Sequence, residues 1–141
     1  MNKPATVETA RTKGGDSEKI TINLGPVDLG QIDLLVEEGF YSNRTDLIRT
    51  AIRNQLALHA GVVRETVARR SLVLGLQHFS RRDLEAVQAA HERLNIHVLG
   101  LASIAPDVSP ELALATIESV LVLGAFHASP AVKAALAGRI H

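Results

Sequence analysis

The sequence contains no cysteine and no tryptophan, and only 3% of its 141 residues are aromatic. Without cysteine the chain forms no disulfide, has no thiolate nucleophile and cannot build a zinc site that needs sulfur ligands. With so few aromatic residues, the core must be aliphatic and consist of leucine, valine, isoleucine and alanine side chains. The absence of cysteine is also typical of a reducing compartment, so we expect a cytoplasmic protein.

An excess of charge of one sign is missing as well, because fifteen basic and fifteen acidic residues cancel. Neutrality argues against a surface coated with nucleic-acid-binding charge, although a local basic ridge still allows DNA binding. No run of about 18 uncharged apolar residues occurs, so we expect no membrane span and no membrane partner. Residues 1–17 are polar and lack the apolar segment of a secretory signal, and we expect them to form a disordered tail.

The segment Lys19–Leu24 alternates polar and apolar residues without interruption. This period of two, with its β-branched residues, predicts a short strand with one buried face. Pro26 suits the first position of a helix, and apolar residues then recur at helical spacing. Gly39 suits the position just after a helix, where a left-handed backbone is common. We therefore predict a strand followed by a helix over Val27–Glu38.

A second helix is predicted to begin at Ser42 or Asn43, because either residue suits the N-cap. Asp46 then lies in the first turn, where a negative charge interacts favourably with the helix dipole. The apolar stripe of this helix continues past Gly61. We therefore expect one helix that runs to about Arg70, with a weak point at the glycine.

A single strand followed by two helices leaves the strand without a partner in its own part of the chain. Unpaired backbone N–H and C=O groups need a ladder, and the economical solution is antiparallel pairing with the same strand of a second copy. One face of such a ribbon, with Ile20, Ile22 and Leu24, packs on the helices of the dimer. The other face is polar, and a two-stranded ribbon fits the major groove. The sequence therefore predicts a homodimer that binds double-stranded DNA.

Glu18–His59 resembles the ribbon-helix-helix (Arc/MetJ/CopG) superfamily of dimeric repressors in the order and spacing of these elements. Within it, the segment YSNRTDLIR over residues 41–49 is similar to the start of the second helix in nickel-responsive repressors and ParD-like antitoxins. The resemblance implies that three alternate strand residues read DNA bases. By position these are Lys19, Thr21 and Asn23. Their alternative role is the solvated face of an edge strand.

The resemblance also implies that the N-terminus of the second helix binds a DNA phosphate. The residues concerned are Ser42, Asn43 and Arg44, acting through their backbone. Physics supports this role, because free N–H groups and the helix dipole favour an anion. As an alternative, the Arg44 side chain pairs with Glu37 or Glu38 on the surface.

From Leu72 onward the sequence contains an internal repeat. The tripeptide Val-Leu-Gly occurs at residues 73–75, 98–100 and 122–124, at spacings of 25 and 24 residues. Each copy is followed by a serine suited to a helix N-cap and then by an apolar helical stripe. These serines are Ser80, Ser109 and Ser129. The first stripe contains His91 and Leu94, so His91 is predicted to pack within a helix. We therefore predict three strand-turn-helix units that stack on one another.

Three roles compete for residues 71–141. An assembly or partner-binding module is favoured by the repeat, by the aliphatic content and by the lack of a polar constellation. A metal or small-molecule sensor would use imidazole ligands, but the histidines lack ligand spacing and the cysteine of the nickel-responsive repressors is absent. The histidines concerned are His78, His91, His97 and His127. An enzyme is disfavoured, because no phosphate loop, nucleophile elbow or zinc-helix motif is present.

The complete prediction is an α+β protein in three parts. Residues 1–17 form the tail, 18–70 a ribbon-helix-helix domain for DNA binding and dimerisation, and 71–141 a small αβ strand-turn-helix repeat domain. We expect a nucleoid-associated transcriptional repressor without catalytic residues, metal or cofactor, which forms higher homo-oligomers or binds a protein partner through residues 71–141. The alternative functions are an antitoxin of a toxin–antitoxin pair and a metal- or small-molecule-responsive repressor. A role in plasmid partition or DNA architecture also stays open.

Overall fold

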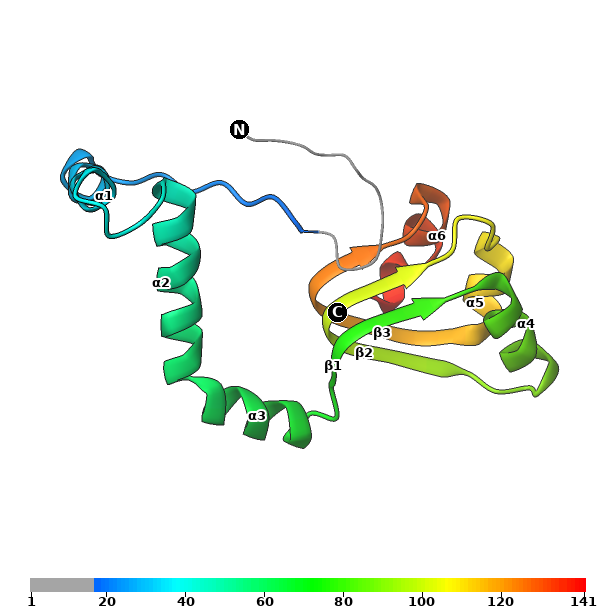
Figure 1. Ribbon diagram of the computed structural model, residues 1–141. Coiled ribbons are helices and arrows are strands. Elements are labelled where there is room, and N and C mark those ends of the chain that lie inside the picture. Colours follow the sequence, from blue (N-terminus) through cyan, green and yellow to red (C-terminus); the bar gives the residue numbers. More distant parts are fainter. Residues whose placement is uncertain (1–16) are drawn as a thin grey trace. The chain divides into compact units, whose positions relative to one another are not determined.

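The computed structural model describes residues 17–141, and the chain divides into two compact units (Figure 1). The first unit is Lys19–Thr66, which is helical after its first residues, and the second contains Val67–His141, which holds a sheet and further helices. The division falls within a helix, α3 (Ala60–Arg69). Over the described range, no helix has both the length and the apolar character needed to cross a membrane.

The first helix, α1 (Pro26–Glu37), begins at a proline, whose fixed φ and missing N–H cost nothing in the first turn. It ends in a Schellman motif. The Gly39 N–H donates to the Val36 carbonyl (3.1 Å), and the Phe40 N–H donates to the Leu35 carbonyl (3.0 Å). Gly39 has a φ of +87°, a left-handed conformation that costs glycine little. The predicted end of this helix is confirmed.

The single helix predicted to reach about Arg70 is wrong. The chain forms two helices, α2 (Arg44–Leu58) and α3, because it leaves helical geometry at His59, where φ is −104° and ψ is 11°. The break precedes Gly61, the predicted weak point, by two residues. Glycine stabilises a helix by about 1 kcal/mol less than alanine does, so an interruption beside it costs little.

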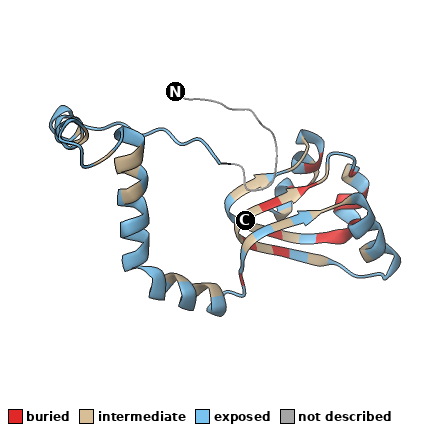
Figure 2. Cartoon of the chain, viewed as in Figure 1, coloured by how far each residue is buried: buried red, intermediate tan, exposed pale blue. Residues whose placement is uncertain are grey.

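The first unit has no buried residue within the single chain, as Figure 2 shows. Residues 17–25 form neither helix nor strand, so the predicted strand over 19–24 has no ladder with any described residue of this chain. Large apolar side chains are exposed along the whole unit. They include Ile20, Ile22, Leu24, Val27, Leu34, Phe40, Ile52, Leu56, Leu58 and Val62.

The second unit is built on a parallel sheet with the strand order β1-β2-β3. Its strands are β1 (Val73–Phe79), β2 (Leu94–Ile104) and β3 (Ile117–His127). A helix follows each strand: α4 (Arg81–Ala89), α5 (Pro110–Thr116) and α6 (Pro130–Ala135), with a final 3-10 helix over Ala137–Arg139. The core between strands and helices is aliphatic, as the composition predicts. Its most buried side chains are Leu84, Ile96, Val98, Ile117, Val120, Val132 and Leu136.

The three Val-Leu-Gly tripeptides lie side by side across this sheet, in register residue for residue. Their glycines, Gly75, Gly100 and Gly124, have φ angles of +127°, +140° and +125°. A Cβ on Gly100 would lie 2.1 Å from the Gly75 carbonyl oxygen, and a Cβ on Gly124 would lie 2.1 Å from that of Gly100. Neither position therefore accepts a side chain. Figure 1 shows that β2 and β3 bend sharply, which strand glycines permit.

The three predicted serine N-caps are confirmed. The hydroxyls of Ser80, Ser109 and Ser129 accept hydrogen bonds from the backbone N–H three residues further along, at 3.0, 3.1 and 3.2 Å. Ser80 also donates its backbone N–H to the Asp83 carboxylate, which completes a capping box. The interpretation of the strands and helices as a repeat module stays a prediction.

The predicted helical stripe through His91 and Leu94 is wrong. His91 lies beyond the end of α4, is exposed and has a φ of +58°, and Leu94 is the first residue of β2. The His91 N–H donates to the Gln88 carbonyl (3.0 Å), as the left-handed residue of a helix C-terminus does. His91 therefore ends the helix and does not pack within it.

Candidate nucleic-acid interface

The three residues predicted to read bases, Lys19, Thr21 and Asn23, are all exposed. They alternate with Ile20 and Ile22, whose side chains are 76% and 59% exposed in the single chain. Both faces of the segment are therefore open to solvent. A ribbon would bury the isoleucine face and would leave an ammonium, a hydroxyl and an amide on the other, which are groups that bond to base edges.

The N-terminus of α2 is held by a reciprocal pair of side-chain hydrogen bonds. The Asp46 N–H donates to Asn43 Oδ1 (2.8 Å), and the Ser42 N–H donates to Asp46 Oδ2 (2.9 Å). Asn43 is thus the N-cap, one of the two residues predicted for it. Within the described part of the chain, the backbone N–H groups of Asn43 and Arg44 have no hydrogen-bond partner. Two of the three predicted phosphate-binding N–H groups thus have no partner among residues 17–141, and the third is bonded to a carboxylate.

The Arg44 side chain is bonded to Asp33 of α1. Its Nε and Nη2 atoms donate to the two Asp33 carboxylate oxygens at 2.7 and 2.9 Å. This hydrogen bonding lowers the pKa of Asp33 and raises the pKa of Arg44. The pair joins α1 to α2, while about half of each side chain stays exposed. The Arg44 guanidinium is therefore already bonded to a carboxylate of the same chain.

The partner of Arg44, Asp33, was not predicted from the sequence. The predicted partners, Glu37 and Glu38, are the last acidic residues before Arg44 in the chain. A signal was present, because Asp33 lies one helical turn before Glu37 and shares its face of α1. The side chains that meet across two helices are decided by how the helices cross, which the spacing within one helix does not specify.

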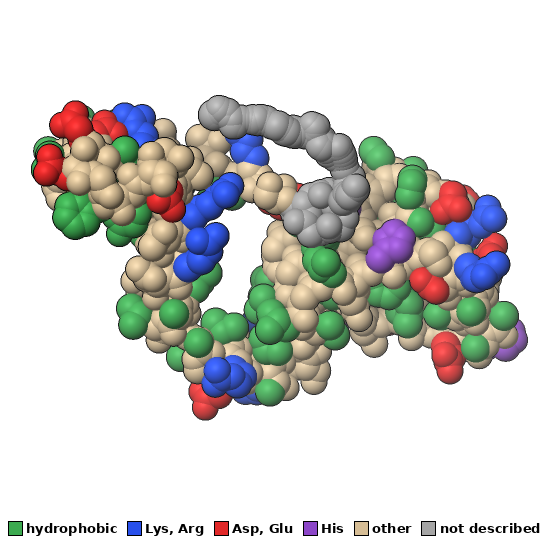
Figure 3. All heavy atoms as spheres, in the orientation of Figure 1, with side chains coloured by type: hydrophobic (Ala, Val, Ile, Leu, Met, Phe, Trp, Pro, Cys, Tyr) green, Lys and Arg blue, Asp and Glu red, His purple; other side chains and the backbone are tan. Residues whose placement is uncertain are grey.

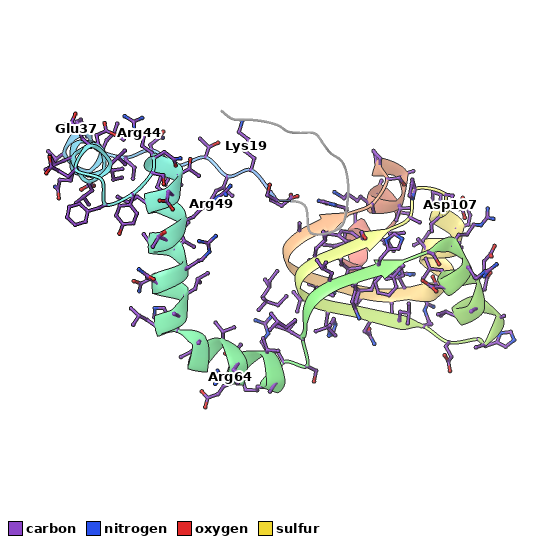
Figure 4. All side chains as sticks on the ribbon, in the orientation of Figure 1. Lys19, Glu37, Arg44, Arg49, Arg64 and Asp107 are labelled. Carbon is purple, nitrogen blue, oxygen red and sulfur yellow. The ribbon has the colours of Figure 1, made fainter. Side chains whose placement is uncertain are left out.

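Charge in the first unit is divided between its two main helices, as Figure 3 shows. The helix α1 carries three acidic residues and no basic one, whereas α2 carries three arginines and one aspartate. Two of these arginines, Arg49 and Arg53, lie one turn apart and are exposed (Arg49 is labelled in Figure 4). The neutral composition of the chain thus hides a local basic helix, α2.

Two histidines of the second unit, His78 and His97, are paired with serines, whereas His127 Nε2 lies 3.0 Å from Glu18 Oε2. His78 Nδ1 lies 2.8 Å from Ser103 Oγ, and His97 Nε2 lies 3.3 Å from Ser119 Oγ. Among residues 17–141, no three His, Asp or Glu side chains come together as a metal site would require. Each histidine–serine contact joins side chains of neighbouring strands, β1 with β2 and β2 with β3.

A pocket of about 400 Å³ lies beside α4 and α5 in the second unit. Arg81 on its wall lies 3.8 Å from Glu85 and 3.9 Å from Asp107 (Asp107 is labelled in Figure 4). The lining also contains Glu111, so one arginine faces three carboxylates and the pocket carries an excess of negative charge.

Residues 15–133 match the model of the Ribbon-Helix-Helix transcriptional regulator family. The match extends far beyond Glu18–His59, the segment on which the resemblance rests, and includes the whole sheet of the second unit. A search of curated proteins finds no match, and neither does a search of solved structures. The family match covers most of the chain and agrees with the exposed alternating segment and the two helices that follow it. The chain therefore belongs to the ribbon-helix-helix transcriptional regulator family.

Proposed function

We propose that this chain acts as a homodimeric transcriptional repressor that reads the major groove with a ribbon formed by residues 19–24 of two copies. The observation that carries the proposal is the absence of any buried residue in Lys19–Thr66. Helices of this length owe most of their stability to the packing of an apolar face. A second copy is the partner that supplies the missing half of the core.

Pairing of the two segments would build that core. Ile20 and Ile22 are largely exposed in the single chain. Full burial of such a side chain contributes roughly 1.5–3 kcal/mol, and a two-fold axis doubles each contribution. The backbone N–H and C=O groups of the segment gain a ladder at the same time. Dimerisation and folding of the first unit are therefore one process on this proposal.

The opposite face of the ribbon would carry Lys19, Thr21 and Asn23 from both copies. Lysine donates to guanine, asparagine forms two hydrogen bonds with adenine, and the threonine methyl group contacts that of thymine. A good bidentate contact discriminates between bases by roughly 1–3 kcal/mol. One dimer therefore reads a short site, and useful specificity requires several dimers on adjacent sites.

The N-terminus of α2 would position the dimer on the DNA backbone. The free N–H groups of Asn43 and Arg44 and the helix dipole favour a phosphate. The Asp46 carboxylate, bonded to Ser42, opposes that charge and keeps the contact modest. The Arg44 side chain supports the site indirectly, because its bond to Asp33 holds α2 against α1. Such a contact sets register on the duplex and carries no sequence information.

The second unit would join dimers or hold a partner protein. It has its own aliphatic core, and the family match includes most of the unit. A module that links neighbouring dimers compensates for the short site that each dimer reads, because linked binding events raise overall affinity.

The test replaces Lys19, Thr21 and Asn23 together by alanine in the full-length chain. Sites are first located by genome-wide mapping of bound DNA, and binding to the most occupied site is then compared with unrelated DNA by fluorescence anisotropy. We expect the preference for the mapped site to disappear, since the base-contacting groups are lost. Sedimentation should still show the dimer, because Ile20 and Ile22 are unchanged.

Lys133→Ala on α6 is the control, since it removes one positive charge outside the ribbon and should leave the preference intact. A triple variant that keeps the full preference would contradict the assignment of these residues to base reading. The repressor role is tested by a reporter under a mapped promoter, whose expression should rise when the triple variant replaces the parent chain.

A further inference from the structure

The sheet of the second unit has two edges, and the described residues cover part of only one of them. At β3, Ile140 forms a parallel bridge with Val120, and the His141 N–H donates to the Val120 carbonyl at 2.9 Å. These last residues cover part of that edge. At the other edge, β1 pairs with β2 alone, and no described strand lies on its outer side.

Gly75 in β1 has the same left-handed backbone conformation as Gly100 and Gly124, but no neighbouring strand requires a glycine there. At Gly100 and Gly124, the carbonyl of the preceding strand fills the place of a Cβ. Gly75 has a φ of +127°, yet a Cβ there would meet no described atom within 4 Å. By the same stacking geometry, that Cβ would project from the open edge toward the place of a next strand. Glycine keeps this place free for a neighbouring backbone.

The strand also lacks the features that usually prevent edge pairing. Natural edges carry lysine, proline or a bulge that blocks another chain. β1 has the sequence VLGLQHF, without a Lys, Arg, Asp, Glu or Pro residue. Its Leu74 and Leu76 are 66% and 61% exposed. An open, apolar edge strand of this kind is a template for a strand from another chain.

We infer that β1 pairs edge to edge and antiparallel with β1 of a second copy of this chain. In a head-to-tail arrangement, β1 would lie against β3 of the other copy, but Ile140 and His141 already occupy part of that edge. A two-fold arrangement uses β1 of both copies and closes after two. Pairing therefore ends with one continuous sheet that has both outer edges partly covered.

A second copy fits this edge better than a foreign strand does. A contact between two short strands buries far less than the roughly 1,200 Å² of a stable complex. Such a contact forms when its partners are already held together, because tethering raises the effective concentration to about the millimolar range. The ribbon proposed above tethers two copies. The inference thus rests on the proposed assembly role of the second unit, and it identifies the edge of β1 as the surface through which that unit assembles.

Single introduced cysteines test the pairing in the full-length protein, because the chain has no cysteine of its own. Opposite residues in an antiparallel pair have Cα atoms about 4.5–5.5 Å apart, which a disulfide can bridge. Leu76→Cys cross-links if the pairing is centred on residue 76. A mixture of Leu74→Cys and Leu76→Cys chains cross-links if it is centred on residue 75. Because both leucines are largely exposed, these substitutions leave the core intact.

Leu123→Cys is the matched control. Leu123 is also an exposed leucine of the sheet, but it lies on β3, two strands away from the open edge. Under mild oxidation, we expect the β1 cysteines to form covalent dimers at least about tenfold faster than the Leu123→Cys chain does. Equal rates at both places, or no covalent dimer from either β1 arrangement, would overturn the inference.

DNA binding by the same variants separates this inference from the proposed function. The cysteine variants leave Lys19, Thr21 and Asn23 unchanged, so each should keep the DNA preference of the parent. Cross-linking through β1 in a chain that shows no DNA preference would uphold the edge pairing and reject the base-reading role of the ribbon. DNA preference without cross-linking would uphold the base-reading role of the ribbon and reject the edge pairing.

Discussion

The two units of this chain differ in where their apolar side chains find a partner. The second unit encloses its own core, in which Leu84, Val98 and Ile117 are fully buried. The first unit, Lys19–Thr66, has no fully buried residue, although its isoleucines and leucines follow the same amphipathic patterns. Amphipathic pattern therefore specifies which residues seek burial, but it leaves open whether the partner belongs to the same chain. On our proposal, the first unit completes its core only in a dimer.

The largest effect that would break this contrast is expected from Ile22→Lys. A charge on the apolar face of the ribbon would be buried without a partner, so the dimer should be lost together with DNA binding. Hydrogen exchange should show lost protection in α1 and α2, with α4, α5 and the strands unchanged. Sedimentation reports the dimer in the same samples.

Leu74→Lys is the control for this experiment, because it places the same charge on an exposed leucine of the second unit. It should leave the exchange of α1 and α2 unaltered. An Ile22→Lys chain that remains dimeric, with both helices protected, would mean that the first unit closes its core in some other way.

The next largest effect is expected within the second unit, from Gly100→Ala. The added Cβ would lie 2.1 Å from the Gly75 carbonyl oxygen, and φ of +140° is strained for any side chain. We expect the free energy of unfolding of this unit to fall by about 3 kcal/mol or more. Urea unfolding, followed by circular dichroism, measures it.

Gly138→Ala provides the comparison for Gly100, since a Cβ there would meet no described atom within 4 Å. Its stability should stay close to that of the parent. Equal stability of the two variants would show that the glycine row is not required for the strands to stack.

The smallest effect is expected from Ser80→Ala, which removes the N-cap of α4. Loss of a serine cap costs about 1 kcal/mol of stability. The backbone N–H and the hydroxyl of Ser80 both lower the pKa of Asp83. The stabilisation from Asp83 is therefore present above the pKa of an unfolded aspartate, and it is lost as the pH falls through the lowered value.

Because the alanine variant keeps only one of these two bonds, its stability should fall less on acidification than that of the parent. Urea midpoints at about pH 7 and about pH 3 measure the difference. Ser80→Thr keeps the hydroxyl and should behave like the parent. If the alanine variant lost as much stability on acidification as the parent does, the Ser80 hydroxyl would not stabilise the charged Asp83 carboxylate.

The features predicted correctly from the sequence are those that a few neighbouring residues decide. Pro26 begins α1, Gly39 ends it, and the serines before α4, α5 and α6 are N-caps. Each signal is a steric or hydrogen-bonding preference of one residue for one backbone position. Such preferences hold in any context that tolerates a helix.

The features that were missed depend on contacts or on competing backbone geometries. Two of them are backbone conformations, the break at His59 and the left-handed His91. The third is the bond between Arg44 and Asp33, which depends on how α1 and α2 pack. Apolar spacing alone continues a helix through His91 and Leu94, because a helical stripe and a turn into a strand place apolar residues alike over a few positions.

The sequence by itself determined the alternating segment with Lys19, Thr21 and Asn23, the two helices after it, and three matched tripeptides. Local preference and periodicity suffice for these. Only the tertiary structure decided that the tripeptides lie in register, that their glycines leave no space for side chains, and that the edge of β1 stays open. The physical reason is that strand stacking depends on backbone groups about 25 residues apart, whose approach no local preference encodes.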